Sequence, residues 1–161
     1  MRWGEFERSA PELAAMGRER FERDQLALAG TLRADGSPRI SPVAPYLALG
    51  HVLLGMEWPT SKARDLLRDP RCTLHTVVSD PDGADGEFKL YGRAVLVEDE
   101  AIVNEPSDAW WHGRRPGTYR VFSMDIQSAA FIGWNIEFDQ MRLIRWSPAD
   151  GLTDVTQARL T

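Results

Sequence analysis

Most of this chain consists of short apolar runs of strand length, each followed by residues typical of turns. This spacing predicts strands over residues 26–32, 52–56, 71–78, 87–97, 119–126, 129–134 and 141–146. The first run leads into an Asp35-Gly36 turn, which is a strong hairpin signal. A doubly wound dinucleotide-binding domain is disfavoured, because it requires a Gly-x-Gly-x-x-Gly run that the sequence lacks. We therefore predict a mainly β fold, an antiparallel barrel with few helices.

A further strand is expected over residues 39–49, but it contains Pro42 and Pro45. Proline has no N–H to give to a ladder, so this strand should be bulged or partly unpaired, and a ligand could occupy the gap. Gly92 suggests a bulge within 87–97. Helices are predicted over 5–24, 62–69 and 98–104, the second of them stopped by Pro70.

The length of 161 residues fits a single domain. We expect residues 1–24 to form an N-terminal helical cap, residues 25–146 the barrel and residues 147–161 a C-terminal tail. The net charge of −5 and the isoelectric point near 5.2 argue against a nucleic-acid partner, which normally selects a basic surface.

No apolar run approaches the roughly 20 residues that span a bilayer, so no membrane segment is expected. The first residues lack the apolar core of a secretory signal. The only cysteine, Cys72, excludes an internal disulfide and is expected to be a small core residue. Together these features predict a cytoplasmic protein.

Only two of the nineteen basic residues are lysines, Lys62 and Lys89. Lys62 stands at the start of the helix predicted over 62–69, beside the hydroxyls of Thr60 and Ser61. Helix starts offer free N–H groups to anions, and lysine adds a compact point charge. With Arg39 on a neighbouring strand, these residues predict an anion site. An alternative stays open, in which both lysines are ordinary surface residues without a binding role. It is more plausible for Lys89 than for Lys62.

The histidines, His51, His75 and His112, are too scattered to predict a metal site. Trp110-Trp111 beside His112 could line a pocket by stacking on a planar ring. We favour the other interpretation, in which this pair covers a barrel end or a dimer surface.

Three segments in this order resemble the pyridoxamine 5'-phosphate oxidase-like family of FMN-binding split barrels. They are Gly30–Val43, Gly55–Arg71 and Lys89–Val97. The resemblance implies a six-stranded antiparallel Greek-key barrel with added helices. It also implies a homodimer that binds FMN, or an F420-type deazaflavin, at the subunit interface.

The same resemblance implies a set of cofactor-binding positions. They are Arg39, Ile40, Ser41, Pro42, Val43, Met56, Glu57, Ser61, Lys62 and Lys89. The backbone of 39–43 would face the ring, while Arg39, Ser61 and Lys62 would hold the phosphate. Met56 and Glu57 would lie beside the cofactor, and Lys89 would reach the ring.

We expect a flavin- or deazaflavin-dependent oxidoreductase acting on a small molecule, with no catalytic side chain, because the cofactor carries the chemistry. Pyridoxamine phosphate is not the expected substrate, because residues 141–146 lack the histidine of the family's substrate signature. The alternative is a non-catalytic module that binds or senses a flavin or haem, with His75 or His112 as a possible axial ligand. A dimeric scaffold without ligand is a third reading.

Overall fold

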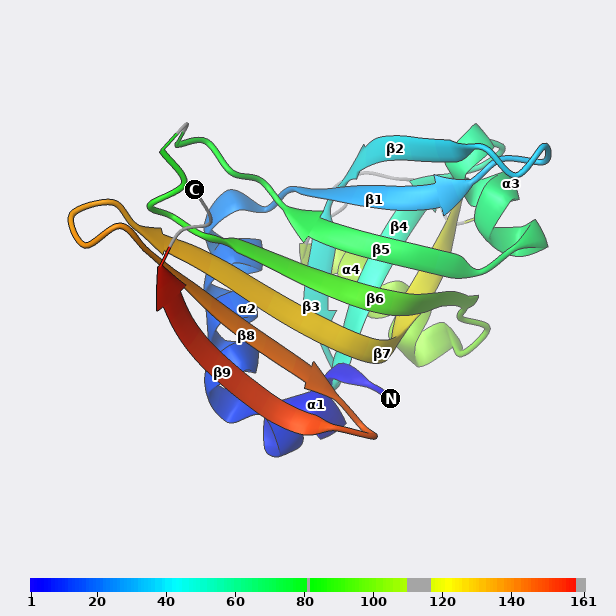
Figure 1. Ribbon diagram of the computed structural model, residues 1–161. Coiled ribbons are helices and arrows are strands. Elements are labelled where there is room, and N and C mark those ends of the chain that lie inside the picture. Colours follow the sequence, from blue (N-terminus) through cyan, green and yellow to red (C-terminus); the bar gives the residue numbers. More distant parts are fainter. Residues whose placement is uncertain (81, 110–116, 159–161) are drawn as a thin grey trace.

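The computed structural model describes residues 1–80, 82–109 and 117–158, with the side chains of 105–109 left out. Its described part forms one antiparallel sheet of nine strands with four helices (Figure 1). The helices are α1 (Trp3–Ser9), α2 (Pro11–Asp24), α3 (Ser61–Arg68) and α4 (Glu100–Ala109). The strands are β1 (Ala27–Leu32), β2 (Pro38–Val43), β3 (Pro45–Ala48), β4 (His51–Glu57), β5 (Arg71–Thr76), β6 (Glu87–Leu96), β7 (Tyr119–Asn135), β8 (Gln140–Ser147) and β9 (Gly151–Ala158).

The strands follow the order β2-β1-β5-β6-β7-β4-β3, and β8 and β9 extend the sheet from β7. β2 and β4 lie far apart in this order yet contact each other, so the sheet curls into a barrel (Figure 1). The predicted split-barrel fold is confirmed, and β8 and β9 carry the sheet beyond the barrel. Among the described residues, no helix has the length and apolar character to cross a membrane.

The helix predicted over 5–24 is two helices, because Pro11 begins α2. Proline fits the first turn of a helix and disfavours a helical conformation in the residue before it. Ala10 accordingly adopts φ −145° and ψ 66° between the two helices. Both helices pack aromatic side chains against the sheet, as in the 5.0 Å contact between the rings of Phe6 and Trp146.

The strand predicted over 39–49 is interrupted at Ala44, as its two prolines suggested. β2 pairs only with β1, so Pro42 lies on a sheet edge where its missing N–H costs no ladder bond. The bulge predicted at Gly92 is also present, as a register shift between Tyr91 and Gly92. A Cβ at Gly92 would meet the Asp125 carbonyl oxygen at 2.0 Å, so only glycine fits there.

The C-terminal part of the chain is more regular than expected. The strands predicted over 119–126 and 129–134 are one continuous strand, β7, and the predicted tail 147–161 contains β9. Every residue of β9 is exposed, so the strand lacks the buried alternation that would mark it in the sequence.

Candidate functional site

The predicted anion site lies where the start of α3 meets the edge strand β2. Thr60 precedes α3 in an extended conformation, and the first turn leaves the N–H groups of Ser61, Lys62 and Ala63 without partners inside the helix. Lys62 Nζ donates to the Pro42 carbonyl oxygen at 2.8 Å and so ties the helix start to β2. We call Arg39, Ser61 and Lys62 the anion cradle, because Arg39 and Ser61 line one pocket and Lys62 follows Ser61 and reaches β2.

Asp65 is the counter-ion of the anion cradle, and the sequence analysis missed it. Its carboxylate is 4% exposed and accepts hydrogen bonds from Arg39 Nε at 2.6 Å, Thr31 Oγ1 at 3.2 Å and Arg68 Nη2 at 3.1 Å. Burial raises the pKa of Asp65, but the bonds from Arg39, Arg68 and Thr31 outweigh it and leave the pKa below its ordinary value. Asp65 therefore stays ionised beneath the cradle.

Arg39, predicted to hold a phosphate, is thus partly engaged by Asp65. Only its Nε takes part in that pair. Its two terminal nitrogens make no hydrogen bond to any residue that the structure describes, and they remain available to an anion. Asp65 fixes the guanidinium in position without using its outer donors.

A pocket of about 360 Å³ opens beside the anion cradle. Its lining consists of Arg33, Ala34, Asp35, Arg39, Ser61, Arg64, Asp65 and Arg68, and we call it the arginine pocket. Four arginines face two aspartates, so its wall carries a net charge of +2, whereas the whole chain carries −5. The wall of this pocket is therefore locally basic in a protein that is acidic overall.

The hydroxyl of Thr60 supplies an independent indication of a ligand. Thr60 Oγ1 is buried and has no hydrogen-bond partner within the described ranges. A buried hydroxyl without a partner is costly, and such groups call for an explanation, for example an unseen ion or water. Its place at the N-cap of α3 fits an anionic group bound at this helix start.

Of the remaining predicted positions, some are buried or face away from the anion cradle, while others adjoin it; the Glu57 carbonyl oxygen, for example, accepts from the Thr60 N–H at 3.0 Å. Val43 and Met56 are buried in the core. Glu57 ends β4 opposite Tyr119 and does not line the arginine pocket. Along β2, Arg39, Ser41 and Val43 share one face, while Ile40 and Pro42 share the other; Ile40 is 73% exposed.

Lys89 lies on β6, three strands from β2 and therefore about 14 Å away. It is the cross-strand neighbour of His75 on the outer face of the sheet. Its Nζ pairs with the Glu87 carboxylate. The structure therefore separates Lys89 from the anion cradle and joins it to a second polar cluster.

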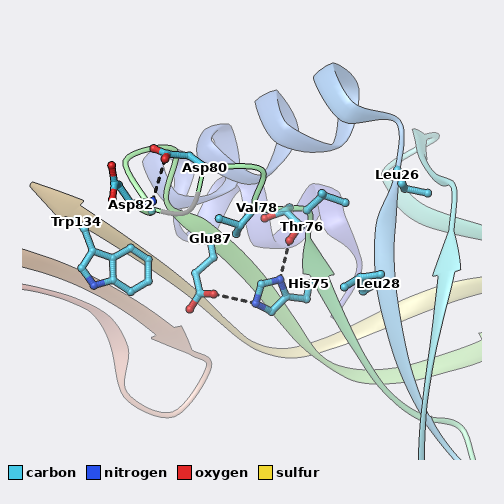
Figure 2. A pocket seen from close by; sticks show the side chains of 11 residues that line it. Leu26, Leu28, His75, Thr76, Val78, Asp80, Asp82, Glu87 and Trp134 are labelled. Atoms are coloured by element: carbon cyan, nitrogen blue, oxygen red, sulfur yellow. Dashed lines mark hydrogen bonds and ion pairs between the residues drawn. The ribbon is translucent and has the colours of Figure 1, made fainter.

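This second cluster borders a pocket of about 660 Å³, which we call the histidine pocket (Figure 2). Leu26, Leu28, Val78 and Trp134 form its apolar wall. The whole lining consists of Leu26, Leu28, His75, Thr76, Val77, Val78, Asp80, Asp82, Gly83, Glu87 and Trp134. Its position at the ends of β1 and β5 places it at the opposite end of β1 from the turn that carries Arg33.

Both ring nitrogens of His75 are engaged in the histidine pocket. Nδ1 lies 2.6 Å from the Thr76 carbonyl oxygen and Nε2 lies 2.9 Å from Glu87 Oε2 (Figure 2). A carbonyl and a carboxylate only accept, so both contacts are hydrogen bonds only when the ring carries a proton on each nitrogen. In this arrangement His75 has no lone pair to offer a haem iron.

The sequence contained signals for both missed carboxylates. Glu87 stands two residues before Lys89, so the two share a face of β6. Asp65 stands three residues before Arg68 on α3, a spacing that brings side chains together on a helix. The long-range partner Arg39 could not be assigned to Asp65 from spacing alone.

Cys72 lines neither the arginine pocket nor the histidine pocket. Burial raises the pKa of the Cys72 thiol to about 12, so Cys72 is an inert core residue as predicted. The described residues contain no group of three or more histidine, cysteine or acidic side chains placed to hold a metal ion. Trp110, Trp111 and His112 lie outside the described residues.

Comparison with known proteins places the chain in a family. The sequence model described as pyridoxamine 5'-phosphate oxidase matches residues 15–133, which include both β2 and α3. This chain belongs to the pyridoxamine 5'-phosphate oxidase family. No curated protein matches the chain by sequence.

Solved structures of this family share the fold. A pyridoxamine 5'-phosphate oxidase-related, FMN-binding protein from Nostoc punctiforme has a TM-score of 0.63 at 11% identity, covering 92% of this chain and 95% of its own. A Clostridium acetobutylicum protein related to general stress protein 26, of the pyridoxinephosphate oxidase family, has a TM-score of 0.58 at 14% identity, covering 90% and 93%.

A haem-binding protein from Mycobacterium smegmatis is also similar, with a TM-score of 0.63 at 19% identity. The match covers 83% of this chain but only 57% of that protein. The structural neighbours of this chain therefore include both FMN-binding and haem-binding proteins.

Proposed function

We propose that this chain binds FMN or an F420-type deazaflavin and acts as an oxidoreductase on a small molecule. The observation that carries the proposal is the anion cradle, in which Arg39 and Ser61 line a basic pocket at a helix start and Lys62 joins that helix start to β2. Membership in the pyridoxamine 5'-phosphate oxidase family and the FMN-binding neighbour support it.

The residues of the cradle fit the phosphate of such a cofactor. Lys62 and the outer nitrogens of Arg39 supply two positive charges, and Ser61 and the N-cap Thr60 supply hydroxyls. When bound, a flavin or deazaflavin supplies hydride transfer, and the protein supplies binding and orientation. The work of this chain's own residues is then to hold the phosphate and to position the ring against the sheet.

We further propose a homodimer with the cofactor at the subunit interface. The outer face of the sheet carries large exposed apolar side chains: Leu28, Ile40, Tyr91 and Val95. Large exposed apolar side chains on one face of a sheet fit a protein interface. Lys89 lies on the same face, so a partner covering it would also cover the position expected to reach the ring.

The proposal is tested by titrating the protein with FMN and with the deazaflavin coenzyme while following tryptophan fluorescence. We expect saturable binding, tighter for one cofactor than for the other. In Lys62→Gln, the tighter-binding cofactor should bind about 10- to 100-fold more weakly, since a hydrogen bond to a charged group contributes about 1.5–3 kcal/mol. Glutamine can still donate to the Pro42 carbonyl, so the tie between helix and strand is retained. No change in the tryptophan fluorescence of the wild type with either cofactor would contradict the proposal.

A second candidate function is a non-catalytic module that binds or senses a flavin or haem. Similarity to the haem-binding protein from Mycobacterium smegmatis favours it. Turnover separates the two candidates. Oxidation of a reduced nicotinamide or a reduced deazaflavin by an electron acceptor, faster with protein than without it, supports the enzyme; cofactor binding without turnover supports the module.

A further inference from the structure

The arginine pocket and Lys62 of the anion cradle together carry five positive and two negative charges, a net charge of +3, whereas one phosphate monoester carries about −2. Arg33 enters it from the turn between β1 and β2, and Arg64 enters from α3, three residues after Ser61 and therefore on the same helix face. Arg39 and Ser61 belong to both the anion cradle and the arginine pocket. The pocket is thus a continuation of the cradle.

The four arginines differ in how far the protein itself uses them. Arg68 donates to the Leu32 carbonyl and to Asp65, and Arg39 donates to Asp65. Arg33 and Arg64, by contrast, form no hydrogen bond or ion pair through their side chains with any part of the chain that the structure describes. Two complete guanidinium groups therefore face this pocket with all their donors available.

The two carboxylates of the pocket are already satisfied within the protein. Asp65 accepts from three donors, and Asp35 accepts from the backbone N–H and the hydroxyl of Ser37 at 2.9 and 2.7 Å. The bonds from Ser37 chiefly, and the charge of Arg33 to a smaller extent, lower the pKa of Asp35. Neither carboxylate pairs with the guanidinium of Arg64 or forms a hydrogen bond with Arg33.

We propose that the arginine pocket binds a second anionic group of the same ligand whose phosphate occupies the anion cradle. Guanidinium forks match carboxylates and phosphates in two-point contacts, and Arg33 and Arg64 present two such forks. This inference rests on the proposed function and selects between its two cofactors. FMN ends in a single phosphate, whereas the deazaflavin coenzyme continues beyond its phosphodiester into carboxylates, and the pocket favours the second.

The experiment compares three probes: riboflavin, FMN and the deazaflavin coenzyme with its glutamate tail. Each is titrated into wild type, into the double variant Arg33→Gln/Arg64→Gln and into the control Arg8→Gln/Arg145→Gln. The control removes the same charge from exposed positions on α1 and β8, away from the pocket. We expect the double variant to bind the deazaflavin at least about 10-fold more weakly, with FMN affinity changed less than about twofold, and the control to leave both unchanged.

The outcomes separate this inference from the proposed function. If no probe binds the wild type, the proposed function is wrong. If the deazaflavin binds and the Arg33→Gln/Arg64→Gln variant binds it equally well, the cofactor site stands and the second anionic subsite is wrong. Two further outcomes contradict the subsite. The Arg33→Gln/Arg64→Gln variant could bind FMN and the deazaflavin more weakly by the same factor, or the control variant could bind both more weakly. In either case the arginines would act through the overall charge of the protein and not through direct contacts.

Discussion

The arginine pocket and the histidine pocket lie at opposite ends of β1, and both contain charged side chains, but they use them differently. At the histidine pocket, Glu87 binds both His75 and the neighbouring Lys89, so these three side chains are paired within the protein. In the arginine pocket, Arg33 and Arg64 remain unused and Arg39 is used on one side only. The number of charges in a pocket therefore says less about its ligand than the number of donors left available.

The largest effect is expected at Asp65, whose loss would leave Arg39 and Arg68 beside a buried site without a counter-ion. Asp65→Asn should lower the free energy of unfolding by about 2–3 kcal/mol, less than for a fully buried pair because both arginines are partly exposed. Urea unfolding measures this. Asp35→Asn, in the same pocket but exposed, is the matched control and should unfold at nearly the wild-type urea concentration.

The contribution of Asp65 to stability should also depend on pH. The pKa of Asp65 is lowered in the folded protein, so its contribution is fully present above the unfolded-state pKa of about 3.9 and is lost as the pH falls through the folded value. The difference in unfolding free energy between wild type and Asp65→Asn should be constant from pH 7 to pH 5 and should shrink below about pH 4. A difference that grew at low pH would contradict this assignment.

A smaller effect is expected at Glu87 in the histidine pocket. Glu87→Gln keeps one acceptor but removes the charge shared by His75 and Lys89, so stability should fall by about 1–2 kcal/mol. Because this pocket is expected to hold no phosphate, the affinities for FMN and riboflavin should change by the same factor. If the Glu87→Gln variant lost affinity for FMN but not for riboflavin, the histidine pocket would also contribute to phosphate binding, and the two pockets would not differ as described.

No effect is expected when His75 is tested as a haem ligand. Both of its nitrogens are engaged, so His75→Ala should leave the Soret band of haem added to the protein unchanged in position and intensity. A Soret band present in the wild type and shifted or lost in the variant would show that His75 leaves Glu87 to bind iron.

The sequence was sufficient to predict the barrel and the bounds of α3 to within one residue, because both depend on local patterns. Hairpin spacing marks the strands, Pro59 precedes the helix start at Ser61, and Pro70 follows the helix end at Arg68. That the residues of the anion cradle bind a cofactor stays a prediction. The division of the first helix at Ala10 is also signalled by Pro11, because proline fits the first turn of a helix and disfavours a helical conformation in the residue before it.

What could not be predicted depends on contacts between distant residues. Asp65 meets Arg39 across 26 residues, and no periodicity links the two. β9 was missed because it buries no side chain and pairs only with β8. The pairing of His75 with Glu87 depends on the register of β5 against β6, which places His75 opposite Lys89 and near its same-face neighbour Glu87.

The most direct test of the central claim is the ratio of the dissociation constants of riboflavin and FMN, which differ only by the phosphate. If the anion cradle binds that phosphate, the wild type should bind FMN at least about 10-fold more tightly than riboflavin, and Lys62→Gln should close most of that gap while leaving riboflavin affinity unchanged. Equal affinities of the wild type for the two flavins would show that the cradle does not bind a flavin phosphate.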